Sequence, residues 1–214
     1  TLTSKELLVS NSVTIIGPGS ANLTISGSRS NRAFHVVNGA NAAIAGLTIY
    51  NGFASGHGGG ILNDHSTLTV SNCTVTGNIA YGRGGGIGND GTGGGKAALT
   101  VIDCLVSGNE SGLDGGGVGS DSDLGGNATL TVVGSTFHEN WTRDTGGGLA
   151  NYADRNGTGI VTVAGSTFSR NTTSSSGSGG GIVDFGGSVS LATMTVSNCY
   201  LTGNKTPYRG GGIL

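Results

Sequence analysis

The chain has 214 residues, of which 45 are glycine, and its 10 Lys and Arg against 12 Asp and Glu give a net charge of −2. Glycine in a helix interior costs about 1 kcal/mol relative to Ala, so this composition excludes a mainly helical fold. The low net charge argues against disorder, and the lack of a basic excess excludes a typical nucleic-acid-binding protein. No apolar run reaches the ~20 residues of a membrane-spanning helix, so we expect no transmembrane segment.

The first part of the chain, residues 1–52, predicts irregular coils of β-structure. Apolar residues two positions apart indicate short strands, because alternate residues of a strand share a face. These pairs are Val13/Ile15, Leu23/Ile25 and Phe34/Val36. The spacing of Ala42, Ile44, Leu47 and Ile49 then matches that of Leu68, Val70, Cys73 and Val75.

The rest of the chain, residues 53–214, is built from repeats that each carry three glycines followed by an aliphatic residue. Successive triple glycines lie 26, 31, 31, 33 and 31 residues apart, beginning at Gly58, Gly84, Gly115, Gly146, Gly179 and Gly210. Two further columns keep the same step: Val70, Val101, Val132, Val163 and Val196, and Asn78, Asn109, Asn140, Asn171 and Asn204. A shared period in independent columns is typical of a repeat architecture.

Each repeat predicts three short strands: one after the glycines, one around the valine column, and one that ends at the asparagine. Only two residues separate the second strand from the third, which allows a corner but no crossover. We therefore predict an all-β fold, a single-stranded right-handed parallel β-helix (solenoid) with about 31 residues per coil. Its right hand is expected from the general rule for parallel crossovers and from the family resemblance given below. We expect residues 1–214 to form one domain and to be a segment of a longer chain.

The interior of this solenoid is predicted to be a set of stacked columns. Phe137 and Phe168 are expected to stack one coil apart, and the asparagine column is expected to hydrogen-bond along the axis. Cys73, Cys104 and Cys199 share one interior column with Ser135 and Ser166. Because neighbours in register point the same way, we expect free, buried thiols rather than a disulfide.

Two motifs resemble those of a known family. The triple glycine plus aliphatic is similar to the GGA[ILV] motif of the chlamydial polymorphic membrane proteins, with Gly in place of Ala. Their FxxN motif matches Phe137-His138-Glu139-Asn140 and Phe168-Ser169-Arg170-Asn171. More broadly the chain resembles the right-handed, pectate-lyase-like β-helix repeats of large bacterial surface and secreted proteins. The resemblance implies an extracellular or cell-surface module with an adhesive or binding role.

In most coils the segment between the third strand and the next glycines is five residues long: 79–83, 110–114, 141–145 and 205–209. Equal lengths place equivalent side chains along one edge, where aromatic rings beside charged groups suit the apolar faces and hydroxyl edges of sugars. The candidate ligand-binding residues are Tyr81, Arg83, Asp114, Trp141, Arg143 and Asp144. The alternative interpretation is a solvated edge that keeps the solenoid soluble.

The loops after the first strand contain several aspartates. A stack of carboxylates either spreads into water or holds a cation, and Asp121-Ser122-Asp123-Leu124-Gly125 begins like a calcium loop but lacks the later acidic ligands. Asp90, Asp121 and Asp123 are the calcium candidates, and we expect no other cofactor.

Three functions stay open from the sequence. The favoured hypothesis is a non-catalytic surface module that binds a glycan or another surface or matrix ligand. An alternative is a polysaccharide lyase or hydrolase, for which Asp114, Arg83 and Glu110 are the best catalytic set. A third is a structural subunit that associates with itself end to end, since open solenoid ends invite strand pairing.

Overall fold

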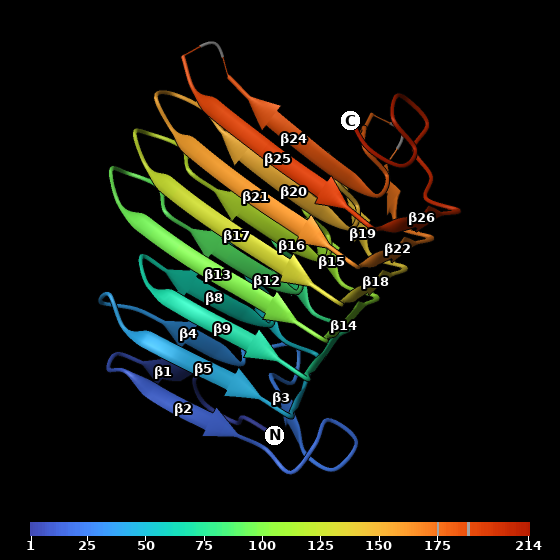
Figure 1. Ribbon diagram of the computed structural model, residues 1–214. Helices are drawn as coiled ribbons and strands as arrows, with labels where there is room; N and C mark the ends of the chain where they lie inside the picture. Colours follow the sequence, from blue (N-terminus) through green and yellow to red (C-terminus); the bar gives the residue numbers. More distant parts are fainter. Residues whose placement is uncertain (175, 188) are drawn as a thin grey trace.

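The computed structural model describes residues 1–174, 176–187 and 189–214, which form a parallel β-solenoid of about six turns. Within these residues there is no helix, and hence none long and apolar enough to cross a membrane. Figure 1 shows the coils stacked along one axis, from the N-terminus at the lower end to the C-terminus at the upper end. The solenoid that the repeats predict is confirmed.

Three sheets of seven strands run along the solenoid, and each strand pairs in parallel with its counterparts in the coils before and after. Sheet A contains the strands after the glycines: β1 (Leu7–Val9), β4 (Phe34–Val36), β8 (Ile61–Asp64), β12 (Ile87–Asp90), β16 (Val118–Asp121), β20 (Leu149–Ala153) and β24 (Ile182–Gly186). Sheet B contains the valine-column strands: β2 (Val13–Ile16), β5 (Asn41–Ala45), β9 (Thr67–Ser71), β13 (Lys96–Ile102), β17 (Asn127–Val133), β21 (Thr158–Ala164) and β25 (Leu191–Ser197).

Sheet C contains the strands before the asparagines: β3 (Thr24–Ser26), β6 (Thr48–Tyr50), β10 (Thr74–Thr76), β14 (Leu105–Ser107), β18 (Thr136–His138), β22 (Thr167–Ser169) and β26 (Tyr200–Thr202). A fourth sheet, D, adds to the three strands per coil that the repeats predict. Its members are two residues long: β7 (Phe53–Ala54), β11 (Ile79–Ala80), β15 (Glu110–Ser111), β19 (Trp141–Thr142) and β23 (Thr172–Thr173). They begin directly after the asparagine column, where a loop was predicted.

The core is the predicted set of columns. Ile61, Ile87, Val118, Leu149 and Ile182 are fully buried on sheet A, and so are the four valines from Val70 to Val163 on sheet B. On sheet C the column is Val75, Val106, Phe137 and Phe168. Each parallel step places like residues over one another, so the apolar side chains of sheets A, B and C meet inside the coil and stack along its axis.

The asparagine column satisfies its own hydrogen bonds along the axis. Asn140 is fully buried, and its Nδ2 donates to Oδ1 of Asn171 at 2.9 Å and to the carbonyl of Val106 at 2.9 Å. Its Oδ1 accepts from the backbone N–H and from Nδ2 of Asn109. The same set recurs from Asn78 to Asn204 and fixes where sheet C ends and sheet D begins.

The triple glycine is required by space as well as by conformation. Gly115 has a φ of 68°, a region that glycine occupies at little cost. A Cβ on Gly116 would lie 2.4 Å from the carbonyl oxygen of Trp141, and one on Gly117 only 2.5 Å from that of Gly148. Larger side chains here would push neighbouring coils apart.

The three cysteines are free, as predicted. Cys73 and Cys104 are buried, and Cys199 is half-buried. The backbone N–H of Cys73 donates to Sγ of Cys104, which in turn donates to the carbonyl of Ile102. The neighbouring Cys73 thiol and burial both raise the pKa of Cys104 above its ordinary value, which keeps it protonated.

Candidate functional site

The predicted binding residues lie on two different faces of the coil. Tyr81, Trp141 and Arg143 project from sheet D, whereas Arg83 and Asp114 lie over the outer face of sheet A. Asp144 lies between the two sets: it lines a small pocket with Arg143, and burial together with the charge of Asp114 raises its pKa.

On the sheet D face the binding residues line a groove, here called the tryptophan groove, with a volume of about 530 Å³. It is lined by Tyr81, Glu110, Gly112, Trp141, Arg143, Ser174 and Ser176. The side chain of Tyr81 is strongly exposed, and that of Trp141 is half-buried. Aromatic rings and polar groups thus converge on one concave surface, the usual form of a ligand site.

The tryptophan groove has a rigid floor. Glu110 and Trp141 lie in register on β15 and β19. The next residues, Ser111 and Thr142, point inward, are fully buried and share a 2.8 Å hydrogen bond between their hydroxyl groups. Gly112 allows the two coils to approach closely here, since a Cβ on it would lie 2.4 Å from the carbonyl oxygen of Tyr81.

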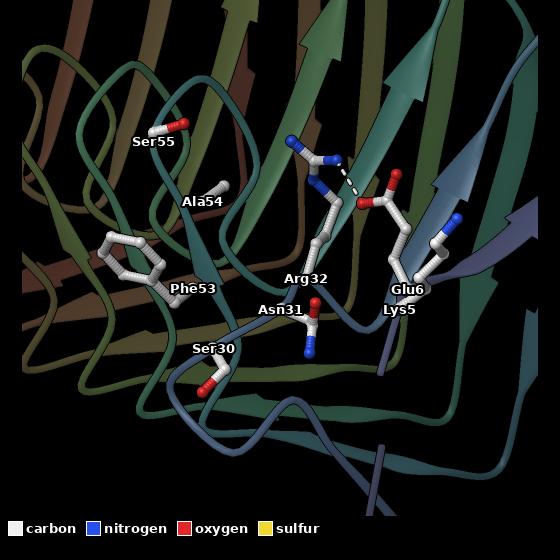
Figure 2. A pocket seen from close by; sticks show the side chains of 8 residues that line it. All are labelled: Lys5, Glu6, Ser30, Asn31, Arg32, Phe53, Ala54 and Ser55. Atoms are coloured by element: carbon white, nitrogen blue, oxygen red, sulfur yellow. Dashed lines mark hydrogen bonds and ion pairs between the residues drawn. The ribbon is translucent and has the colours of Figure 1, made fainter. Parts of the chain in front are cut away.

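A second pocket, here called the phenylalanine pocket, opens on the side of sheet D nearer the N-terminus. Its volume is about 330 Å³, and it is lined by Lys5, Glu6, Ser30, Asn31, Arg32, Phe53, Ala54 and Ser55. Figure 2 shows the carboxylate of Glu6 joined to the guanidinium of Arg32, at 2.5 Å, with Phe53 beyond Arg32. Phe53 also meets the ring of Tyr81 edge to face, with centroids 5.2 Å apart.

The guanidinium of Arg32 is already bonded within the protein and is not free to bind a ligand. It is 12% exposed, and it also donates to the backbone carbonyls of Gly58 and His57. Glu6 in turn accepts from His35. The groups in this pocket that stay turned to solvent are therefore Lys5, Phe53 and the short polar side chains around them.

On sheet A, Arg83 forms the centre of a buried charge cluster. Its Nε donates to Asp114 at 2.8 Å and its Nη1 to Asp121 at 2.6 Å. All three side chains are at most 14% exposed. The guanidinium lies 3.7 Å from the ring centroid of Tyr152, a cation–π contact. Thr145 completes the cluster by donating its hydroxyl to Asp114 at 2.7 Å.

Burial raises the pKa of Asp121 above its ordinary value, although Arg83 and the N–H of Asp123 oppose the shift. Burial likewise raises the pKa of Tyr152. Shifted pKa values occur both at functional sites and in structural networks of ion pairs. Since Arg83 already bonds both carboxylates, the arrangement favours a structural role for this cluster.

Two aromatic residues near Arg83, Tyr152 and Phe185, were not predicted from the sequence. Tyr152 stacks on Phe185 with ring centroids 4.8 Å apart, and Nδ1 of His57 accepts the backbone N–H of Arg83. The spacing of the repeats could have predicted the contact between Tyr152 and Phe185. One column on the outer face of sheet A contains Asp64, Asp90, Asp121, Tyr152 and Phe185. The sequence alone predicts this column only as a stack of carboxylates.

The three calcium candidates have protein partners. Asp121 binds Arg83, Asp123 binds Arg155, and Asp90 accepts the backbone N–H of Thr92. Among the described residues, no three His, Cys, Asp or Glu side chains are grouped closely enough to hold a metal ion. Calcium binding therefore stays a prediction without support from the geometry.

The residues proposed for catalysis do not share one open site. Glu110 lines the tryptophan groove, while Arg83 and Asp114 are bonded to each other over sheet A. A lyase needs its base next to the substrate, and a hydrolase needs two carboxylates that flank one bond. The tryptophan groove offers binding groups and a single carboxylate.

Comparisons with protein-family models, with curated proteins and with solved structures find no match for this chain.

Proposed function

We propose that the chain is a non-catalytic binding module and that the tryptophan groove holds a glycan. The observation that carries this proposal is the pairing of the Trp141 and Tyr81 rings with the charged groups of Glu110 and Arg143 on one surface. A sugar ring offers an apolar face for stacking and hydroxyl groups for hydrogen bonds, so it matches both features of the groove.

The rigid floor of the tryptophan groove supports binding, and its single carboxylate, Glu110, does not supply the pair that a hydrolase needs. A site whose floor is already ordered loses little conformational entropy on binding, which favours affinity. We propose that the module lies outside the cell or on its surface, where the glycans of surfaces and matrices would be its ligands.

Affinity electrophoresis tests this proposal with gels that contain hyaluronan, alginate, xylan or dextran. We expect at least one polysaccharide to retard the protein, and Trp141→Ala to weaken that retardation at least tenfold, because an aromatic anchor concentrates binding energy. Tyr200→Ala is the matched control, because it removes another exposed aromatic ring, 67% exposed, from β26 of sheet C and outside the groove. It should leave the retardation unchanged.

Equal retardation of Trp141→Ala and the unsubstituted protein would contradict the proposal. Release of reducing or unsaturated sugar ends from any of the polysaccharides would replace it with the enzyme alternative.

A further inference from the structure

The outer face of sheet B carries a column of five threonines, one from each of five successive coils. They lie in parallel register on β9, β13, β17, β21 and β25, and they are Thr69, Thr100, Thr131, Thr162 and Thr195. Each of them is half-buried or exposed, because its neighbours in the strand point into the core. Figure 1 shows the strands of sheet B one above another in nearly the same direction, so the threonines form a regular row.

The surface around this threonine column is uncharged. Two further outward columns flank it, Thr67, Ala98, Thr129, Ile160 and Thr193 on one side and Ser71, Ile102, Val133, Ala164 and Ser197 on the other. The three columns together are here called the threonine face, and none of their residues is charged or aromatic. The threonine face therefore lacks both the charges that steer a protein partner and the aromatic anchors that concentrate binding energy.

The hydroxyl groups of the threonine column are available to water. On sheet C an outward hydroxyl group can bond to the next coil, as Ser107 does when it donates to Thr76 at 3.2 Å. No described residue forms a hydrogen bond with a hydroxyl group of the threonine column. Since threonine is stiff at χ1 and the strands are equivalent, we expect these hydroxyl groups to share one orientation. The column then presents a donor and acceptor at a fixed interval.

This interval is close to a spacing of water molecules in ice. Neighbouring coils lie ~4.8 Å apart. In ice each water bonds to four tetrahedral neighbours at about 2.75 Å, so two waters bonded to the same third one lie about 4.5 Å apart. The spacings differ by about 0.3 Å per coil, or roughly 1.2 Å over the four steps from Thr69 to Thr195, which small side-chain rotations can absorb. Thr67, Thr129 and Thr193 add a second, interrupted row about 6.6 Å from the first.

We propose that the threonine face binds to the surface of ice crystals. Its hydroxyl groups hydrogen-bond to waters of the lattice, and the methyl groups between them lie against the crystal. Each contact is weak, but a rigid row makes many contacts at once, and their effects combine. The lack of charge fits this ligand, because a charged group holds a hydration shell of its own that is costly to remove. The threonine face and the tryptophan groove lie on different sheets, so this inference is independent of the proposed function.

Partition into growing ice tests the inference. Ice that grows slowly from a dilute solution excludes most solutes, whereas a protein that adsorbs to its surface is incorporated. We expect the unsubstituted protein to be enriched in the ice fraction relative to serum albumin added to the same solution. Exclusion of the unsubstituted protein to the same extent as albumin would overturn the inference.

Thr131→Tyr identifies the face that binds. The added ring would protrude from the middle of the threonine face and hold the neighbouring threonines away from the lattice, so most of the enrichment should be lost. Thr136→Tyr is the matched control, since Thr136 is half-buried on the outer face of sheet C, in a column that ends at Tyr200. This control should be enriched like the unsubstituted protein. Thr162→Tyr repeats the test one coil away, should Thr131→Tyr melt at a lower temperature than the control.

Enrichment of the folded Thr131→Tyr or Thr162→Tyr protein equal to that of Thr136→Tyr would place any ice contact on another face and overturn the inference. The two proposals fail separately. Trp141→Ala should partition into ice as the unsubstituted protein does, and Thr131→Tyr should be retarded normally by any polysaccharide that the unsubstituted protein binds.

Discussion

The rings of Phe137 and Phe168 lie one above the other in the interior, with centroids 4.5 Å apart and planes 9° apart. Each ring also fills space that a glycine leaves free. A Cβ on Gly117 would lie 3.1 Å from Cδ1 of Phe137, and one on Gly148 would lie 2.9 Å from Cδ1 of Phe168. The FxxN motif and the triple glycine are therefore two halves of one packing arrangement.

Replacing Phe137 by Ala should lower the free energy of unfolding by about 3–5 kcal/mol, because the fully buried ring would leave a cavity. Urea denaturation measures the change. Phe137→Leu, which keeps most of the volume, should cost clearly less. An Ala variant with an unchanged denaturation midpoint would show that the ring is not buried.

Replacing Asn140 by Ala should lower the free energy of unfolding by roughly 3 kcal/mol or more, because several buried partners lose their hydrogen bonds together. These partners are the carbonyl of Val106 and the N–H and Nδ2 of Asn109. Asn140→Asp keeps the shape but cannot donate, so it should also destabilise the protein. If Asn140→Asp were as stable as the unsubstituted protein, the side chain would not be a required donor.

Arg83→Met should lower the free energy of unfolding by about 3–5 kcal/mol, because Asp114 and Asp121 would stay buried without their cation. Changing both aspartates to Asn in the same protein should recover most of this loss. The loss should also shrink in acid, because burial raises the pKa of Asp121 and its carboxyl group becomes neutral there. A fully stable Arg83→Met protein would contradict the buried cluster.

The Asp64–His65 pair predicts a pH-dependent part of the stability. The hydrogen bond from His65 to the carbonyl of Thr92 raises the pKa of His65 above 6.5, against burial and with help from Asp64. Burial of Asp64 is outweighed by the hydrogen bonds from His65 and His35, which lower the pKa of Asp64 below 3.8. Because the pKa of His65 is raised on folding, the pair stabilises the folded protein fully below pH 6.5, and this stabilisation is lost as the pH rises through the pKa of folded His65. Because the pKa of Asp64 is lowered on folding, its share of the stabilisation is lost in strong acid.

Comparison of His65→Gln with the unsubstituted protein measures this contribution. The difference in melting temperature should be larger at about pH 5.5 than at about pH 8.5, since His65 is charged only at the lower pH. A difference that stays constant over this range would contradict the pair.

The interior could be predicted from the sequence because coils of equal length place residues 31 positions apart directly over one another. Val101 and Val132 therefore reveal their contact in the spacing alone. Sheet D could not be predicted, since a strand as short as Trp141–Thr142 shows no alternation. The site was predicted only in part for a related reason. Arg83 and Trp141 occupy equivalent loops, but the chain turns between their positions, so that one faces sheet A and the other faces outward from sheet D.

The direct test of the tryptophan groove uses the fact that Trp141 is the only tryptophan in the chain. Its fluorescence reports on the groove alone, so titration with a polysaccharide that retards the protein should shift or quench the emission and saturate at the same concentration as binding. Tyr200→Ala should give the same titration curve as the unsubstituted protein. Saturable binding with no change in the emission of Trp141 would place the glycan elsewhere and contradict the proposed function.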